Sequence, residues 1–158
     1  MEDRYLFKAK RTDNGEWVQG YLFDDGFENG RVFIGGLVIE KYNGTACDDW
    51  TISGSCFYEI DKSTICQCTG LKDKNGKLIW ENDVIKYHFG NAYAQIRYGA
   101  YQSCFDNQKT EHIGFYVDWS GKCTKRYRKD LGYWINMVNA EVVGNIFDNP
   151  ELIKESDT

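Results

Sequence analysis

The stretch from residue 69 to residue 87 restricts the fold of this chain more than any other part of the sequence. Two runs with apolar residues flank Asn75-Gly76, the dipeptide that most readily supplies two adjacent residues with positive φ. The sequence therefore predicts a tight type I′ hairpin turn at this dipeptide. Glu-Asn-Asp at 81–83 predicts a second corner, after which the β-branched run 84–87 restarts a strand. No nucleophile, metal-ligand set or phosphate-binding loop occurs here, so the stretch predicts architecture rather than chemistry.

Composition favours strands joined by glycine turns. The 158 residues include 11 Tyr, 9 Phe, 5 Trp and 16 Gly but one Pro. The candidate boundary at 61–63 predicts an acidic β region over residues 1–62 and a second β domain over residues 63–158. We expect a mostly β fold in which an N-terminal antiparallel sheet packs on a C-terminal SH3-like small β-barrel.

The N-terminal half shows one clear hairpin and one ambiguous glycine pair. Strand-like runs on either side of a turn at 11–15 predict a first hairpin across residues 4–23. Gly35-Gly36 separates two β-branched runs and indicates either a two-residue turn or a bulge. Residues 43–55 are typical of a loop or a ragged hairpin.

The C-terminal half alternates in a strand-like way, with one undecided segment. Residues 130–138 fit either a short helical turn or a strand, because periodicity alone does not distinguish them. Residues 141–147 predict a closing strand, and Pro150 favours a helical turn after it.

Three motifs carry a resemblance to a known family. They are RYLFKA at 4–9, TGLKDKNGK followed by IWENDVIK at 69–77 and 79–86, and EVVGNIFDNPEL at 141–152. On these motifs the chain resembles the YopX family of small phage and prophage proteins over nearly its full length. The family often has Gly where this chain has Asn82, and Asn also tolerates left-handed φ. The resemblance implies a phage-related origin and a β-rich fold, and it brings no enzymatic activity and no catalytic residue.

The residue types that most often hold metals are poorly spaced for that purpose. Six cysteines occur, of which Cys66 and Cys68 form a C-x-C pair without a second pair, and His88 and His112 stand apart. The sequence contains no leader of the secretory type, which disfavours a disulfide scaffold. We therefore expect free thiols, no metal site and no cofactor.

The carboxylates of the central stretch have a structural interpretation. Asp73, Glu81 and Asp83 lie within one turn-rich unit, where Asp caps neighbouring backbone N–H groups. No base or nucleophile accompanies them, so we expect no catalytic site and no enzyme.

Charge is unevenly distributed along the chain. The net charge is −5, and residues 1–62 hold 12 acidic and 7 basic side chains. One basic cluster, residues 122–129, lies close to aromatic residues, and cations beside flat rings are typical of platforms for single-stranded nucleic acid. The candidate nucleic-acid-binding residues are Lys122, Lys125, Arg126, Tyr127, Arg128, Lys129 and Trp134. The alternative is a solvated hairpin loop whose cations balance the acidic half.

Some aromatic residues fall on the outer phase of strands that also have an inward apolar set. Tyr87, Phe89, Tyr98 and Tyr101 are the candidate interaction surface.

We predict a non-enzymatic phage or prophage accessory protein that binds itself, as a homo-oligomer, or another phage or host protein. Nucleic-acid binding is the alternative. No run of about 18 apolar residues occurs, so we expect no membrane association and a location in the cytoplasm of a host bacterial cell.

Overall fold

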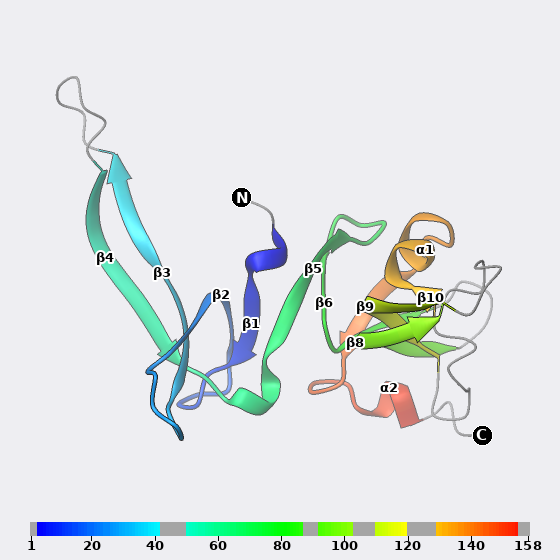
Figure 1. Ribbon diagram of the computed structural model, residues 1–158, viewed down its shortest axis with the longest axis horizontal. Coiled ribbons are helices and arrows are strands. Elements are labelled where there is room, and N and C mark those ends of the chain that lie inside the picture. The colour runs from blue at the N-terminus through cyan, green and yellow to red at the C-terminus, as the bar shows by residue number, and fades with distance from the viewer. Residues whose placement is uncertain (1–2, 42–49, 87–91, 103–109, 120–128, 155–158) are drawn as a thin grey trace. The chain divides into compact units, whose positions relative to one another are not determined.

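The protein is mostly β, as predicted, with two antiparallel sheets (Figure 1). The structure is a computed structural model that describes residues 3–41, 50–86, 92–102, 110–119 and 129–154. Its strands are β1 (Phe7–Lys10), β2 (Trp17–Asp24), β3 (Val32–Lys41), β4 (Trp50–Glu59), β5 (Cys66–Lys72), β6 (Leu78–Trp80), β7 (Asp83–Lys86), β8 (Tyr93–Gln102), β9 (Glu111–Asp118), β10 (Lys129–Asp130) and β11 (Glu141–Asn145). Its short helices are η1 (Asp3–Tyr5), η2 (Lys62–Thr64), α1 (Leu131–Asn136) and α2 (Glu151–Lys154).

The chain divides into two compact units. The N-terminal unit comprises residues 5–67, and the C-terminal unit comprises residues 1–4 and 68–158. Strand β5 crosses this division: its first two residues pair with β1, and its later residues pair with β6. The two domains predicted at 1–62 and 63–158 stay a prediction, because compactness does not establish that a segment folds independently.

The N-terminal unit starts with the predicted hairpin. Strands β1 and β2 pair from Phe7 opposite Gly20 to Lys10 opposite Trp17, which confirms a hairpin in this region. Beyond Gly20, β2 pairs with β3 instead, and β3 pairs with β4. An isolated bridge between Arg11 and Ile60 joins the end of β1 to the end of β4.

Three fully enclosed side chains form the core of this unit. Ala9, Ile34 and Ile60 come from β1, β3 and the residue after β4. Half-buried apolar side chains pack against them, namely Phe7, Val18, Leu22, Val32 and Ile65.

Gly35-Gly36 is neither a turn nor a bulge, so that prediction was wrong. Both glycines lie inside β3, opposite Phe57 and Cys56 of β4. A Cβ atom on Gly35 would lie 2.2 Å from the Cys56 carbonyl oxygen and 2.5 Å from the Phe57 ring. The glycine is therefore required by close packing across the sheet rather than by a change of chain direction.

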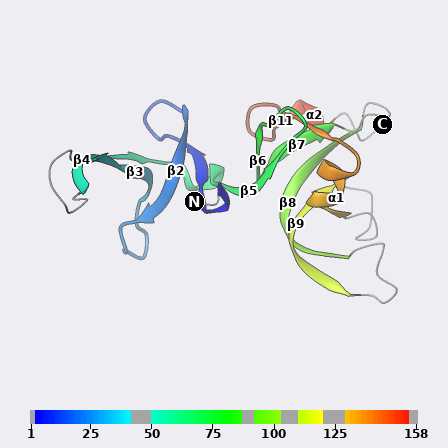
Figure 2. The same cartoon turned by 90° about the horizontal axis from the view of Figure 1, so that it is seen from above.

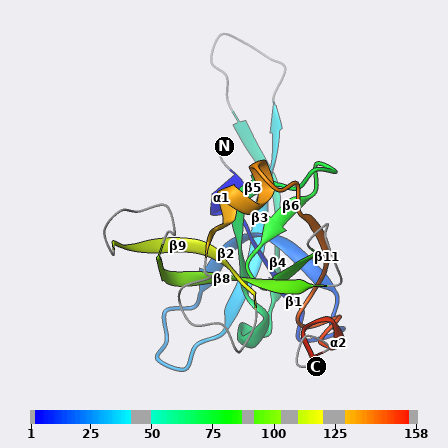
Figure 3. The ribbon, with the colours of Figure 1, turned by 90° about the vertical axis from the view of Figure 1, so that its right-hand side faces the viewer.

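The C-terminal unit contains the five-stranded sheet in the order β10-β9-β8-β7-β11. Its core includes Ile85, Ile96 and Val117 from the sheet, together with Ile79 from β6 and Leu131 from α1. Figures 2 and 3 show the β8–β9 hairpin extending beyond the other strands of this unit. The described strands follow an open order, and the SH3-like barrel stays a prediction.

The segment 130–138, which the sequence left undecided, contains the short helix α1 over Leu131–Asn136. Asp130 is the N-cap of α1, and its carboxylate accepts the Tyr133 backbone N–H at 2.8 Å. The predicted closing strand is β11, and the predicted helical turn after Pro150 is α2.

The turn at residues 73–77 differs in type from the prediction. Gly76 has φ of 78°, but Asn75 is absent from the described residues with positive φ, which excludes a type I′ turn. The Gly76 N–H instead donates to the Asp73 carbonyl at 2.9 Å, and the Asp73 N–H donates to the Lys77 carbonyl at 2.9 Å. This is a three-residue hairpin loop in which a left-handed glycine follows a type I turn.

The corner at Asn82 has the predicted left-handed conformation, with φ of 67°. Its N–H donates to the Ile96 carbonyl at 2.8 Å, and its own carbonyl accepts the Ile146 N–H at 3.1 Å. The corner therefore connects three segments of the C-terminal unit.

Candidate protein-binding surface

One face of the β2–β3–β4 sheet exposes three aromatic side chains. Tyr21 and Phe57 both lie opposite Gly35 in the strand register, and Phe23 lies two residues beyond Tyr21 on the same face. The Phe23 and Phe57 rings meet edge to face, with centroids 5.2 Å apart. The intervening Leu22 faces the core instead. We call Tyr21, Phe23 and Phe57 the aromatic face.

The aromatic face remains accessible despite the contact between its rings. Phe23 is 44% exposed, Phe57 is 46% exposed, and Tyr21 is also exposed. Beside them, the Arg31 guanidinium lies 5.5 Å from the Phe33 ring centroid and 3.9 Å from the Glu59 carboxylate. An exposed aromatic group with a charged border is typical of the centre and rim of a protein interface.

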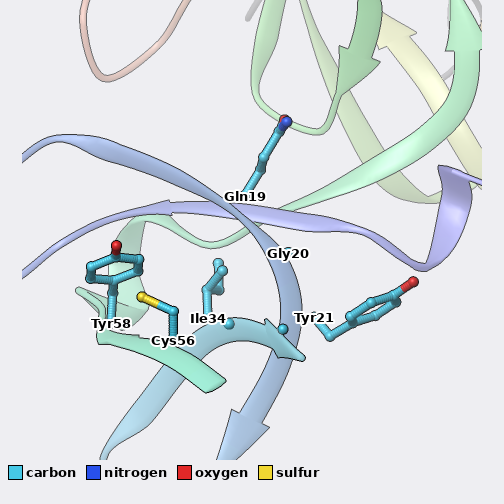
Figure 4. Close-up of a pocket in the computed structure, with 8 residues that line it drawn as sticks. Gln19, Gly20, Tyr21, Ile34, Cys56 and Tyr58 are labelled. Carbon is cyan, nitrogen blue, oxygen red and sulfur yellow. The ribbon is translucent and has the colours of Figure 1, made fainter. Parts of the chain in front are cut away.

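A hollow of about 320 Å³ lies where β2 changes partner (Figure 4). Ile34, Cys56 and Tyr58 border it together with bare glycine backbone, and Figure 4 shows these three side chains pointing to the same side of the ribbon. A hydrogen bond with the Cys56 thiol raises the pKa of Tyr58, and the nearby Arg11 opposes that shift. The Arg11 guanidinium lies 4.3 Å from the Tyr58 ring centroid.

Cations and aromatic rings also meet on β1 and β2. The Lys8 and Lys10 ammonium groups lie 5.1 and 5.5 Å from the Trp17 ring centroid. Arg11 pairs with Asp13, and the hydrogen bond between them raises the pKa of Arg11 and lowers the pKa of Asp13. Trp17 and Tyr58 thus each have a cation on the ring face.

A second, larger hollow continues from this region. Its volume is about 580 Å³, and its lining includes Lys10, Arg11 and Lys62 as cations, with Ile60 as the apolar contribution. Asp61 also borders it, but the Asp61 carboxylate is bonded to the Ser63 N–H and hydroxyl. We call the hollow lined by Lys10, Arg11, Thr12, Gly15, Ile60, Asp61 and Lys62 the basic hollow.

The turn after β2 is acidic and carries an exposed ring. Phe27 is 78% exposed. The Asp24 carboxylate accepts the Gly26 N–H at 2.9 Å, and the Asp25 carboxylate accepts the Arg31 N–H at 2.9 Å. These bonds fix the conformation of residues 24–30, which we call the acidic turn.

Asp25 is the carboxylate that organises the acidic turn. The Arg31 backbone N–H is the main cause of its lowered pKa, and the Phe27 N–H, the Arg31 guanidinium and the Lys62 ammonium lower it further. Lys62 also donates a hydrogen bond to the Gly30 carbonyl, so the acidic turn and the basic hollow meet at Lys62.

The predicted interaction surface divides into described and undescribed residues. Tyr98 is 54% exposed and meets Phe115 edge to face, with centroids 5.2 Å apart. Tyr101 is half-buried and stacks on His112 at 5.5 Å. Tyr87 and Phe89 lie outside the described residues.

The structure does not bring Tyr98 and Tyr101 onto one face. Tyr98 is on the side of β8 that also holds the buried Ile96, whereas Tyr101 is on the opposite side. The aromatic face of the N-terminal unit was missed in the sequence, because Tyr21-Leu22-Phe23 is apolar in both strand phases and alternation cannot assign its inward side.

The candidate nucleic-acid-binding residues are largely outside the described part of the chain. Lys122, Lys125, Arg126, Tyr127 and Arg128 fall there, and Lys129 is placed by its backbone pairing with Val117 in β10. Trp134 is half-buried, and its ring centroid lies 4.5 Å from that of Trp119. The assignment of this segment to nucleic acid stays a prediction.

The two aspartates of the central stretch, Asp73 and Asp83, bond to backbone groups through their carboxylates. The Asp73 side chain accepts N–H groups of Asn75, Lys77 and Val142 at 2.9, 3.0 and 3.2 Å. The Asp83 side chain accepts the Trp80 N–H at 2.9 Å. These contacts agree with the capping roles predicted for the two aspartates.

Sulfur and histidine side chains form no metal cage in the described part of the chain. Cys56, Cys66 and Cys68 are thiols there, and the Cys66 thiol donates to the Thr64 carbonyl at 3.3 Å. Within the same residues no three His, Cys, Asp or Glu side chains come together as metal ligands. The state of Cys47, Cys104 and Cys123, which lie elsewhere, stays a prediction.

None of the helices in the described ranges has the length and apolar character that a membrane crossing requires.

Comparisons with known proteins identify a family. The model of the YopX protein family matches residues 25–154, which include parts of both units. No curated protein matches the chain. The crystal structure of protein EF1440 from Enterococcus faecalis is similar, with 24% identity, a TM-score of 0.47, and coverage of 93% of this chain and 96% of that one.

Proposed function

Because the chain belongs to the YopX family, a name that specifies no reaction, we propose that it is a non-enzymatic phage or prophage accessory protein that acts by binding protein. The partner is most simply a second copy of the chain, and the cytoplasm of a bacterial host is the compartment that the proposal assumes.

The aromatic face is the observation that carries this proposal. Tyr21, Phe23 and Phe57 come from two strands that flank a glycine, so their rings lie over bare backbone and form one apolar surface. Aromatic side chains lose little conformational entropy when they bind, and they supply the largest contributions in protein interfaces. The Asp73 and Asp83 carboxylates of the central stretch bond to backbone groups, which supports a structural rather than a catalytic role for them.

Light scattering coupled to gel filtration tests self-association. At micromolar concentration we expect a species of twice the 18.3 kDa chain mass. The double substitution Phe23→Ser and Phe57→Ser should weaken the association about tenfold or more, because it removes two interface rings. Met137→Ser, at an exposed position of the C-terminal unit, is the control that should leave it unchanged. A wild type with a single 18.3 kDa species over the whole range would refute the proposal.

We also propose that the C-terminal unit is an SH3-like small barrel, with the β5–β6 hairpin as its second layer. Leu71 and Ile79 of this hairpin belong to the same core as Ile85 and Ile96 of the five-stranded sheet. The bulge between Val142 and Gly144 in β11 supplies the bend that such curvature needs. An experimental structure of the unit would test this topology.

A further inference from the structure

The Phe27 side chain projects into solvent from the acidic turn. It is 78% exposed, on a turn whose backbone is held by the Asp24 and Asp25 carboxylates. Glu28 beside it is also exposed. A ring on an already ordered turn binds with a small entropy cost, so the acidic turn has the properties of an interface anchor with negative charge around it.

The basic hollow has the complementary properties. Lys10, Arg11 and Lys62 border it, and Ile60 contributes apolar surface. Its positive charge is reduced by Asp61 and by Asp13, which pairs with Arg11, and it is extended by Lys8 beside Lys10 over Trp17. The cations remain in excess there, whereas carboxylates are in excess on the acidic turn, where Arg31 and Lys62 are nearby cations.

We propose that the acidic turn of one copy inserts Phe27 into the basic hollow of a second copy, with Glu28 facing Lys10. This inference rests on the proposed self-association and specifies its interface. Charge complementarity selects a second copy, because the same unit carries both an acidic anchor and a basic receptor of the size of small ligand sites.

The position of the two features fits a two-fold symmetric dimer. The acidic turn and the basic hollow meet at Lys62, which lines the hollow and donates to the Gly30 carbonyl at the end of the turn. Two copies related by a two-fold axis near Lys62 therefore exchange anchors reciprocally, which closes the assembly as a dimer. Phe23 precedes the acidic turn directly on β2, so the aromatic face continues the same interface.

Complementary charge reversal tests the contact between Glu28 and Lys10. Glu28→Lys alone and Lys10→Glu alone each place like charges opposite one another in a homodimer, and each should weaken it about tenfold or more by analytical ultracentrifugation. In an equimolar mixture, a heterodimer of the two variants has opposite charges at both contacts. We expect the mixture to associate within about threefold of the wild-type affinity.

The anchor and the controls are tested in the same assay. Phe27→Ala should also weaken the dimer about tenfold or more. Met137→Ala and Lys72→Glu, both at exposed positions of the C-terminal unit, should leave it unchanged. Circular dichroism of each variant shows whether the fold is retained.

The outcomes separate this inference from the proposed function. A wild-type dimer that these three variants leave intact, or single variants that the mixture does not restore, would overturn the interface while self-association stands. A monomeric wild type would overturn both. A monomer whose melting temperature rises with inorganic phosphate, and rises less in Lys10→Glu, would assign the basic hollow to a small anion instead.

Discussion

Replacement of Asp73 tests whether one carboxylate joins the central turn to the final strand. Its Oδ1 atom accepts the Asn75 and Lys77 N–H groups inside the turn, and its Oδ2 atom accepts the Val142 N–H in β11. Asp73 is 6% exposed, so water cannot take over all three bonds. Asp73→Ala should therefore lower the stability of the protein through both local and long-range contacts.

The magnitude follows from where each bond lies. The two bonds inside the turn are next to exposed residues, and each is worth about 1 kcal/mol after exchange with water. The Val142 N–H is buried, and loss of its charged acceptor costs about 1.5–3 kcal/mol. We expect Asp73→Ala to lower the free energy of unfolding by about 3.5–5 kcal/mol, a large fraction of the stability of an ordinary domain.

Urea denaturation followed by circular dichroism measures this loss. Glu111→Gln removes an exposed carboxylate from β9 and should change the free energy of unfolding by less than about 0.5 kcal/mol. A loss below about 1 kcal/mol for Asp73→Ala, with an unchanged m-value, would show that the carboxylate does not couple the two segments.

Three further predictions concern a turn, a titrating group and the basic segment. Gly76→Val should destabilise by about 1 kcal/mol or more because φ is 78°, whereas Gly36→Val, with open space and ordinary φ, should be tolerated; thermal melts compare them. Because the Arg31 N–H in particular lowers the Asp25 pKa, Asp25 stabilises the fold above its ordinary pKa of 3.8 and loses this effect as the pH falls through the folded value. The melting temperatures of wild type and Asp25→Asn should thus differ most near neutral pH and converge in acid. For segment 122–129, we expect single-stranded DNA to bind no tighter than about 100 μM at physiological salt; sub-micromolar binding that charge reversal weakens would favour the nucleic-acid alternative.

The local structure that the sequence predicts well depends on short-range chemistry. Asn82 adopts left-handed φ, as expected of the residue type that best replaces glycine there. The position of the turn around Gly76 was predicted correctly, but its type was predicted wrongly. The Asp73 carboxylate accepts backbone N–H groups from within the turn and from β11. The β11 partner is distant in the sequence, so the Asn75-Gly76 dipeptide alone does not predict it.

The candidate surface could not be predicted from local residue patterns, because it depends on strand pairing and side-chain exposure. From the sequence, Gly35 predicts an interruption of the strand, yet it lies in the middle of β3. Glycine is needed there because the Phe57 ring and the Cys56 carbonyl of β4 occupy the space that a Cβ atom would fill. Phe27 could be assigned to a turn, but its exposure depends on how Asp25 folds the backbone around it. Long-range pairing and side-chain accessibility are tertiary properties, which residue patterns constrain weakly.

The most recognisable part of the sequence and the candidate binding surface belong to different units of the chain. Asp73 and Asn82 support turns within the C-terminal unit, whereas Phe27 and Lys10 belong to the N-terminal unit. If the motif residues act on folding and the surface residues act on association, each set of substitutions should change one of two measurements, the free energy of unfolding or the dimer affinity, and leave the other unchanged. Asp73→Ala should lower the free energy of unfolding and leave the dimer affinity of the folded fraction unchanged, because its three described side-chain bonds lie within the other unit. Phe27→Ala should leave the stability of the dissociated chain within about 0.5 kcal/mol, because an exposed ring contributes little to folding, and should weaken association. Loss of association in folded Asp73→Ala would show instead that the C-terminal unit takes part in the interface.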